Sequence, residues 1–219
     1  MSVNNFGYSV KEELANTITH TFGFFLSLIG SVIVIIESVN LYLYGNKDLI
    51  YIISAVIFSL SLLLMYASSS FYHGIKNNQI KSLLQKLDHC AIFLLIAGSY
   101  TPFTLITLGD YGGISLFIFI WSLTAVGILL ESFPFKNSFA ISIVLYFLMG
   151  WSVLAYFEIL YSLININGLI LLIGGGLFYT FGIIFFAWKK IPYNHAIWHV
   201  FVLAGSISHY FSILYYVIE

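Results

Sequence analysis

Residues 167–190 read NGLILLIGGGLFYTFGIIFFAWKK, a continuous apolar run that ends in two adjacent lysines. A helix needs about 20 apolar residues to cross the ~30 Å hydrocarbon core of a bilayer. A transmembrane β-strand would instead show alternation over about ten residues, which is absent here. We therefore expect a membrane-spanning helix over residues 167–188, followed by a charged turn at the membrane surface.

The rest of the chain repeats this pattern. Of its 219 residues, 60% are hydrophobic and only 8% are charged, with a mean hydropathy of +0.98. A soluble domain is typically about one-quarter charged. Polar, turn-forming segments separate seven apolar runs: 18–43, 49–73, 88–108, 113–132, 137–160, 167–188 and 195–218. The sequence predicts an all-α, polytopic membrane protein: a seven-transmembrane-helix bundle forming one domain over 1–219, with a short polar segment over 1–17.

The lysines predict how this bundle lies in the membrane, because cytoplasmic loops are enriched in positive charge. With seven crossings, Lys47 alone falls on the side opposite the N-terminus. The others share the N-terminal side: Lys11, Lys76, Lys81, Lys86, Lys136, Lys189 and Lys190. We expect a cytoplasmic N-terminus, an external C-terminus and a plasma-membrane location. Without arginine and at a net charge of −1, a nucleic-acid-binding face is not expected.

The sequence predicts the local structure of three further segments. In KNNQIKSLLQKL (76–87), apolar residues recur at helical spacing, so the segment either lies along the inner surface or simply connects two spans. Pro102 is expected to kink the third span. The three glycines at 174–176 indicate close helix packing rather than a ligand-binding loop.

Histidines gather at the predicted cytoplasmic ends of four spans. The residues at these ends are His20, His73, Asp88, His89, His195 and His199. Polar residues also form inward-facing stripes on the first span (Glu13, Asn16, Thr17, His20, Ser27, Ser31) and the last (His195, His199, Ser206, His209). Ionisable groups within spans usually face the bundle interior and mark function.

Two of these histidines, His195 and His199, lie four residues apart and therefore on one helix face. Such a pair can bind one zinc ion, with His73 as a third ligand and Asp88 beside the metal's water or a ligand imidazole. His209 lies roughly 15 Å deeper, at 1.5 Å per residue, and is expected to hydrogen-bond within the core.

The other ionisable residues are expected to have roles other than metal ligation. His89 points to another helix face and is expected to be a helix-packing or interfacial residue rather than a ligand, and Glu131 is expected at the membrane interface. His20 is either a partner of a ligand side chain or a pH-sensitive contact between helices.

Three motifs resemble those of the hemolysin III family, which belongs with the progestin and adipoQ receptors and more distantly with the alkaline ceramidases. The motifs are SSSFYH (68–73), LDHCAIFLLIAGSYTPF (87–103) and HAIWHVFVLAGSISHYF (195–211), preceded by EELANTITH (12–20). The resemblance implies a seven-helix bundle with zinc near its cytoplasmic side. It implies His73, His195 and His199 as ligands, Asp88 holding the zinc-bound water, and Ser69 close to the site. Glu13, Asn16 and His20 match the N-terminal motif.

These observations lead to three functional hypotheses. The favoured one is a zinc-dependent hydrolase, by analogy ceramidase-like, that cleaves an amide or ester of a membrane lipid and so contributes to lipid homeostasis. The second is a pore-forming cytolysin, in keeping with the family name. The third is a non-catalytic membrane sensor or receptor with a structural zinc. Receptor-branch members carry a long N-terminal extension, whereas residues 1–17 alone precede the first expected span, so a hormone-receptor role is not expected.

Overall fold

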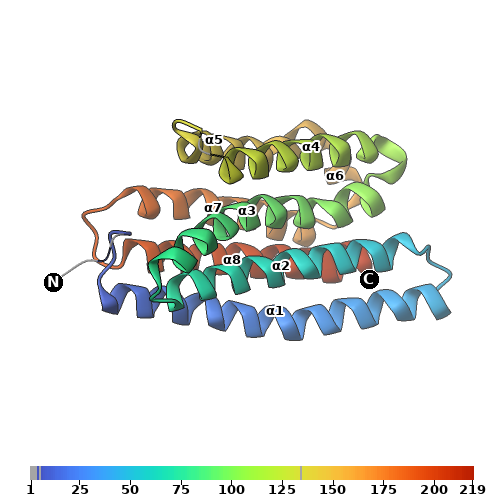
Figure 1. Ribbon diagram of the computed structural model, residues 1–219. Helices are drawn as coiled ribbons and strands as arrows, with labels where there is room; N and C mark the ends of the chain where they lie inside the picture. The colour runs from blue at the N-terminus through green and yellow to red at the C-terminus, as the bar shows by residue number, and fades with distance from the viewer. Residues whose placement is uncertain (1–3, 5, 134) are drawn as a thin grey trace.

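The computed structural model describes residues 4, 6–133 and 135–219, and these residues form a helical bundle (Figure 1). Within these described residues, seven helical segments are long and apolar enough to cross a membrane, which confirms the predicted fold class. The helices are α1 (Val10–Tyr44), α2 (Ile50–Gly74), α3 (Asn78–Pro102), α4 (Gly113–Ser132), α5 (Ser138–Trp151), α6 (Phe157–Leu163), α7 (Ile166–Ala187) and α8 (Asn194–Ile213). The 3₁₀ turn Ser152–Tyr156 joins α5 and α6 into one span.

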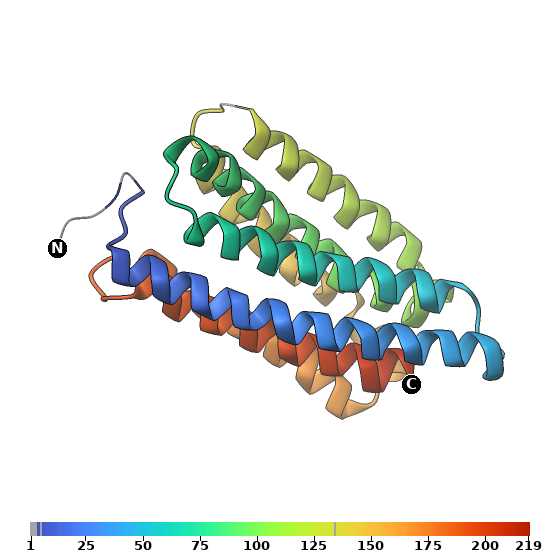
Figure 2. The same cartoon turned by 60° about the horizontal axis from the view of Figure 1, so that its bottom comes forward.

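The helices lie side by side with their long axes roughly aligned (Figures 1 and 2). α1 packs against α2 and α8, α3 packs against α2 and α4, and α7 packs against α8. The N-terminus and the α2–α3, α4–α5 and α7–α8 connections lie at one end, which we call the N-terminal end. The C-terminus lies towards the opposite end. Large apolar side chains such as Val32, Ile36 and Ile170 are exposed on the outside, where lipid would surround them.

The first helix begins earlier than its apolar run. Val10 starts α1 because Ser9 and Glu12 form a capping box: Ser9 Oγ accepts from the Glu12 backbone N–H, and the Ser9 N–H donates to Glu12 Oε2 at 2.8 Å. This extra length adds Glu13 and Asn16 to the helix. The polar stripe faces inward as expected, with Asn16 and His20 almost fully buried.

The segment 76–87 does not form a separate surface helix. Asn77 caps α3 by accepting the backbone N–H groups of Gln79 and Ile80, and the helix then runs unbroken into the third span. Residues 78–97 contain no glycine or proline, so nothing ends the helix before Asp88. The prediction of a helix along the inner surface was therefore wrong, and the connecting alternative lies closer to the structure.

Pro102 is the last residue of α3, and its missing N–H removes one hydrogen bond of the helix there. The span continues as a π-helical turn over Phe103–Thr107, a wider local winding that re-satisfies the backbone beyond the proline. The sequence predicted a kink at this position, and the structure shows a change of helix type.

The glycines at 174–176 allow α7 and α8 to approach closely. A Cβ on Gly175 would overlap the ring of His209 and lie 3.1 Å from the carbonyl oxygen of Gly205. A Cβ on neighbouring Gly174 would meet no atom within 4 Å. The packing interpretation therefore applies to Gly175 in particular.

These two glycines predict opposite effects of the same substitution. Gly175→Ala is expected to destabilise the protein by about 1–3 kcal/mol, because the helices must separate to admit the methyl group. Gly174→Ala is expected to be neutral or to stabilise by up to about 1 kcal/mol, because alanine favours the helix. Thermal unfolding of both variants in detergent measures the difference, and equal melting temperatures would contradict the close-packing argument.

Candidate metal centre

Three histidines from two helices converge at the N-terminal end of the bundle. His73 lies in the last turn of α2, and His195 and His199 lie in the first two turns of α8. All three are buried, and each offers one ring nitrogen within 4.8 Å of the others. The Nε2 atoms of His73 and His195 are 3.1 Å apart. The predicted histidine set is therefore brought together, and it could hold a metal ion.

Each of the three imidazole rings has an oxygen atom within hydrogen-bond distance of its Nδ1 atom. His73 Nδ1 lies 2.7 Å from Glu13 Oε2. His195 Nδ1 lies 3.2 Å from the hydroxyl of Tyr8, and His199 Nδ1 lies 3.2 Å from the Asn16 carbonyl oxygen. The Glu13 carboxylate and the Asn16 carbonyl group can only accept, so they favour a proton on Nδ1 of His73 and His199 and leave each Nε2 lone pair free. The Tyr8 hydroxyl can accept as well as donate, so it permits the same tautomer of His195.

The free nitrogens give a test of whether the site fits a metal ion. His199 Nε2 is buried and has no hydrogen-bond partner among the described residues. With protons on all three Nδ1 atoms, the Nε2 lone pairs of His73 and His195 would face each other without a shared proton. A cation bound by the three nitrogens satisfies all of them, and three imidazoles with oxygen-held rings are the donor set of known zinc sites.

Asp88 and Ser69 lie next to this cluster. Asp88 is buried in α3 and borders a cavity of about 510 Å³ that His195 and Tyr8 also line; we call it the Asp88 cavity. The group of converging ligand atoms contains no carboxylate oxygen, so Asp88 stands outside the direct ligand set. Ser69 is buried one turn before His73, beside Asp88, and its Oγ lacks a hydrogen-bond partner among the described residues.

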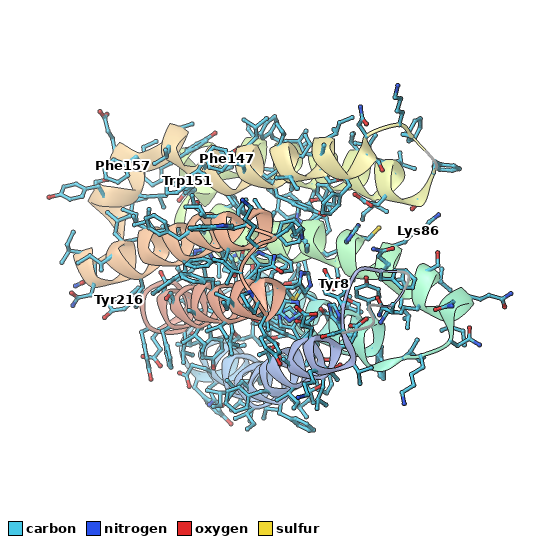
Figure 3. All side chains as sticks on the ribbon, turned by 90° about the vertical axis from the view of Figure 1, so that its left-hand side faces the viewer. Tyr8, Lys86, Phe147, Trp151, Phe157 and Tyr216 are labelled. Carbon is cyan, nitrogen blue, oxygen red and sulfur yellow. The ribbon has the colours of Figure 1, made fainter. Side chains whose placement is uncertain are left out.

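A second cavity also borders the cluster. It has a volume of about 580 Å³ and is lined by Glu13 and His73, and we call it the Glu13 cavity. Tyr8 lines both cavities, and its ring packs against His73 and His195. Burial raises the pKa of the Tyr8 hydroxyl above its usual value, so it stays protonated at neutral pH. Figure 3 looks along the bundle from this end and labels Tyr8 and Lys86, which both border the Asp88 cavity.

The Asp88 cavity adjoins an apolar pocket deeper in the bundle. The two share four wall residues, Ile92, Tyr146, Ile183 and Trp198. The deeper pocket has a volume of about 120 Å³ and lies between α3, α5, α7 and α8. A molecule with a polar head and an apolar tail could therefore place its head beside Asp88 and the adjoining part of its tail in this pocket.

Two contacts of the site have no counterpart in the sequence interpretation. Tyr8 precedes the first helix and carried no pattern that marks it as a histidine partner. Lys81 is buried and forms an ion pair with Glu13, Nζ to Oε1 2.9 Å, although its sequence context suggests a solvated lysine. Glu13 was singled out by its motif, and the structure places it against His73.

The remaining histidines and Glu131 make contacts of three kinds: ring stacking, hydrogen bonds and an ion pair. His20 stacks on His199 with ring centroids 3.4 Å apart, and neither of its nitrogens has a partner among the described residues. His209 lies 3.0 Å from the Leu172 carbonyl oxygen, the core hydrogen bond that was expected. His89 and Glu131 form a pair, Nδ1 to Oε2 3.1 Å. Glu131 lies in the last turn of α4, near the end of its span as expected, and its buried carboxylate also accepts a hydrogen bond from Ser142 Oγ.

Comparison with known proteins agrees with this architecture. The model of a family described as "Haemolysin-III related" matches residues 8–210. The chain is 42% identical over 213 residues to the "Hemolysin-3 homolog" of Bacillus subtilis (strain 168), covering 97% of each protein. It is 40% identical over 209 residues to "Hemolysin-3" of Bacillus cereus, covering 95% of this chain and 93% of the relative.

A more distant relative extends the comparison to animals. The human "Monocyte to macrophage differentiation factor" is 29% identical over 215 residues, covering 94% of this chain and 84% of the relative. The matched region runs from the segment before α1 to the last turns of α8, so it includes every residue of the histidine cluster. The chain belongs to the haemolysin-III related family of multi-pass membrane proteins.

Proposed function

We propose that the protein is a zinc-dependent hydrolase that cleaves an amide or ester bond of a membrane lipid. The main observation behind this proposal is the convergence of three buried imidazole nitrogens, one from each histidine, beside a cavity that adjoins an apolar pocket. A bound zinc ion would polarise a carbonyl oxygen and acidify a water molecule, two requirements for hydrolysis at neutral pH.

The chain's own residues would supply the remaining steps. His73, His195 and His199 would hold the ion, with their rings oriented by Glu13, Tyr8 and the Asn16 carbonyl group. Asp88 borders the cavity next to the cluster, where it would orient the attacking water and accept its proton. The apolar wall formed by Ile92, Ile183 and Trp198 would hold the lipid tail and exclude bulk water.

We further propose that the metal centre lies on the cytoplasmic side of the plasma membrane. The N-terminal end of the bundle carries Lys11, Lys76, Lys86, Lys136, Lys189 and Lys190, whereas the α1–α2 connection at the other end carries Lys47. Positive charge on one set of connections favours a cytoplasmic position for that end. A lipid of the inner leaflet could then enter the Asp88 cavity sideways.

Turnover in reconstituted membranes tests the proposed reaction. Purified protein in proteoliposomes would be incubated with labelled N-acyl and O-acyl lipids, and the released fatty acid would be quantified by mass spectrometry. We expect release that stops when a chelator removes the metal and resumes when Zn²⁺ is restored. Metal-loaded, folded protein with no release from any of these amides or esters would contradict the hydrolase proposal and favour a structural metal.

The name of the Bacillus cereus relative, "Hemolysin-3", favours a second candidate, membrane lysis. Dye-filled liposomes would distinguish the two activities, because a pore releases dye without any change in the lipids. We expect no leakage at protein densities that support hydrolysis. Leakage that persists in the His199→Ala variant would show a pore that does not depend on the metal centre.

A further inference from the structure

Lys81 is an unusual lysine for a membrane protein, because its charged end points into the bundle. The residue is 2% exposed, whereas neighbouring Lys76 on the α2–α3 connection is exposed. Its Nζ atom lies 2.9 Å from Glu13 Oε1 and donates to the Tyr72 carbonyl oxygen at 2.6 Å. The ammonium group also lies 4.6 Å from the centroid of the Tyr72 ring.

The partners of Lys81 explain how a buried cation is tolerated. Burying an ammonium group is costly unless a carboxylate and further acceptors replace its water. Glu13 supplies the carboxylate, and Tyr72 supplies a carbonyl oxygen from the last turn of α2, where the helix dipole favours a positive charge. Lys81 thus ties the start of α3 to the start of α1 and to the end of α2.

The same contacts lead directly to the histidine cluster. Glu13 binds Lys81 through Oε1 and His73 through Oε2. Tyr72, whose carbonyl group accepts from Lys81, is the residue before His73. One buried charge therefore fixes both the carboxylate that holds the His73 ring and the backbone that carries it.

We propose that Lys81 is a positioning residue for the metal centre, acting through Glu13 on His73. It holds the Glu13 carboxylate with one oxygen facing His73 Nδ1, so that the ring presents Nε2 to the ion. This inference rests on the metal centre of the proposed function. It adds to the site a residue from α3 that touches no metal ligand side chain itself.

A double-mutant cycle on metal affinity tests the inference. Zn²⁺ affinity would be measured on the purified full chain by competition with a chromophoric chelator, for wild type, Lys81→Met, Glu13→Gln and the double variant. Partners that hold metal-bound histidines typically change metal affinity by about 10–100-fold. We expect about a tenfold loss for Lys81→Met, a similar or larger loss for Glu13→Gln, and no additional loss when both are changed.

The cycle also separates positioning from a purely structural role. If Lys81 only supports the fold, Lys81→Met would lower the melting temperature of the metal-free protein. It would then reduce Zn²⁺ affinity by the same factor in the wild-type protein and in the Glu13→Gln variant. The absorption bands of bound Co²⁺ report the ligand geometry, and we expect them to shift in Lys81→Met. Lys76→Met removes an exposed lysine that borders the Glu13 cavity, as Lys81 does. We expect this control to leave the Zn²⁺ affinity and the Co²⁺ spectrum unchanged.

Two results would overturn the inference. One is wild-type Zn²⁺ affinity in folded Lys81→Met, and the other is full additivity with Glu13→Gln. If Lys81→Met does not fold, Lys81→Leu removes the same charge and donor with a differently shaped apolar side chain, and wild-type affinity in that folded variant would have the same meaning. A wild-type protein that binds no Zn²⁺ would instead contradict the metal centre itself, so the two failures are distinguishable.

Discussion

Replacing His199 with alanine is expected to abolish stoichiometric zinc binding. The residue is fully buried, and its Nε2 atom is the one cluster nitrogen without a partner among the described residues. Its removal leaves two imidazoles for an ion that normally takes three protein ligands or more, so the affinity should fall by well over ~100-fold. Elemental analysis of detergent-purified protein, prepared without added metal, would give about one zinc per wild-type chain and none per variant.

His209→Gln is the matched control for this experiment. His209 lies on the same helix as His199 but bonds to the Leu172 carbonyl oxygen outside the cluster, and glutamine can donate to that oxygen. We expect the control to retain its zinc. Zinc in folded His199→Ala at the wild-type level would show that the ion binds elsewhere, and folded wild type without zinc would contradict the proposed hydrolase.

The second large effect is expected from Asp88→Asn, which should retain the zinc and lose the hydrolytic activity. Asparagine keeps the size of the side chain but cannot accept a proton from water. A positioned general base typically contributes about 10²–10⁴-fold to a rate, and we expect a fall in turnover of that size. The measurement pairs zinc content with fatty-acid release from proteoliposomes, on the same protein preparation.

Glu131→Gln provides a comparison within the same cavity. Glu131 lines the Asp88 cavity but is bonded to His89 and Ser142. We expect this variant to keep its zinc and most of its activity. Loss of zinc together with activity in Asp88→Asn would make Asp88 a ligand, and full activity in that variant would rule out its role as the base.

The spans were predictable because each depends on a local property. A continuous apolar run of about 20 residues has few alternatives to a membrane helix, whatever the rest of the chain does. The start of α3 was not predictable in this way. Its lysines and leucines suit a surface helix equally well, and the decisive contact, Lys81 with Glu13, joins residues 68 positions apart in the chain.

The centre of the site was predictable for a different reason. A histidine is costly in an apolar run, so the spacing of His195 and His199 and the position of His73 required an explanation. Thr19, whose Oγ1 lies 3.0 Å from His199 Nδ1, and Tyr8 carry no such signal, because threonine and tyrosine are common at helix ends and interfaces. Their contacts with His195 and His199 arise from the packing of the N-terminal segment and α1 against α8.

The placement of the three histidines also has a consequence for biogenesis. His73 lies in the second span, whereas His195 and His199 lie at the start of the seventh. His195 follows His73 by 122 residues. During synthesis the chain emerges from its N-terminus, so a nascent protein lacks two of the three ligands until α8 has been made and has docked against α1 and α7. A metal ion that needs all three histidines would therefore bind only after α8 has inserted, and its binding would stabilise the docked position of this last helix.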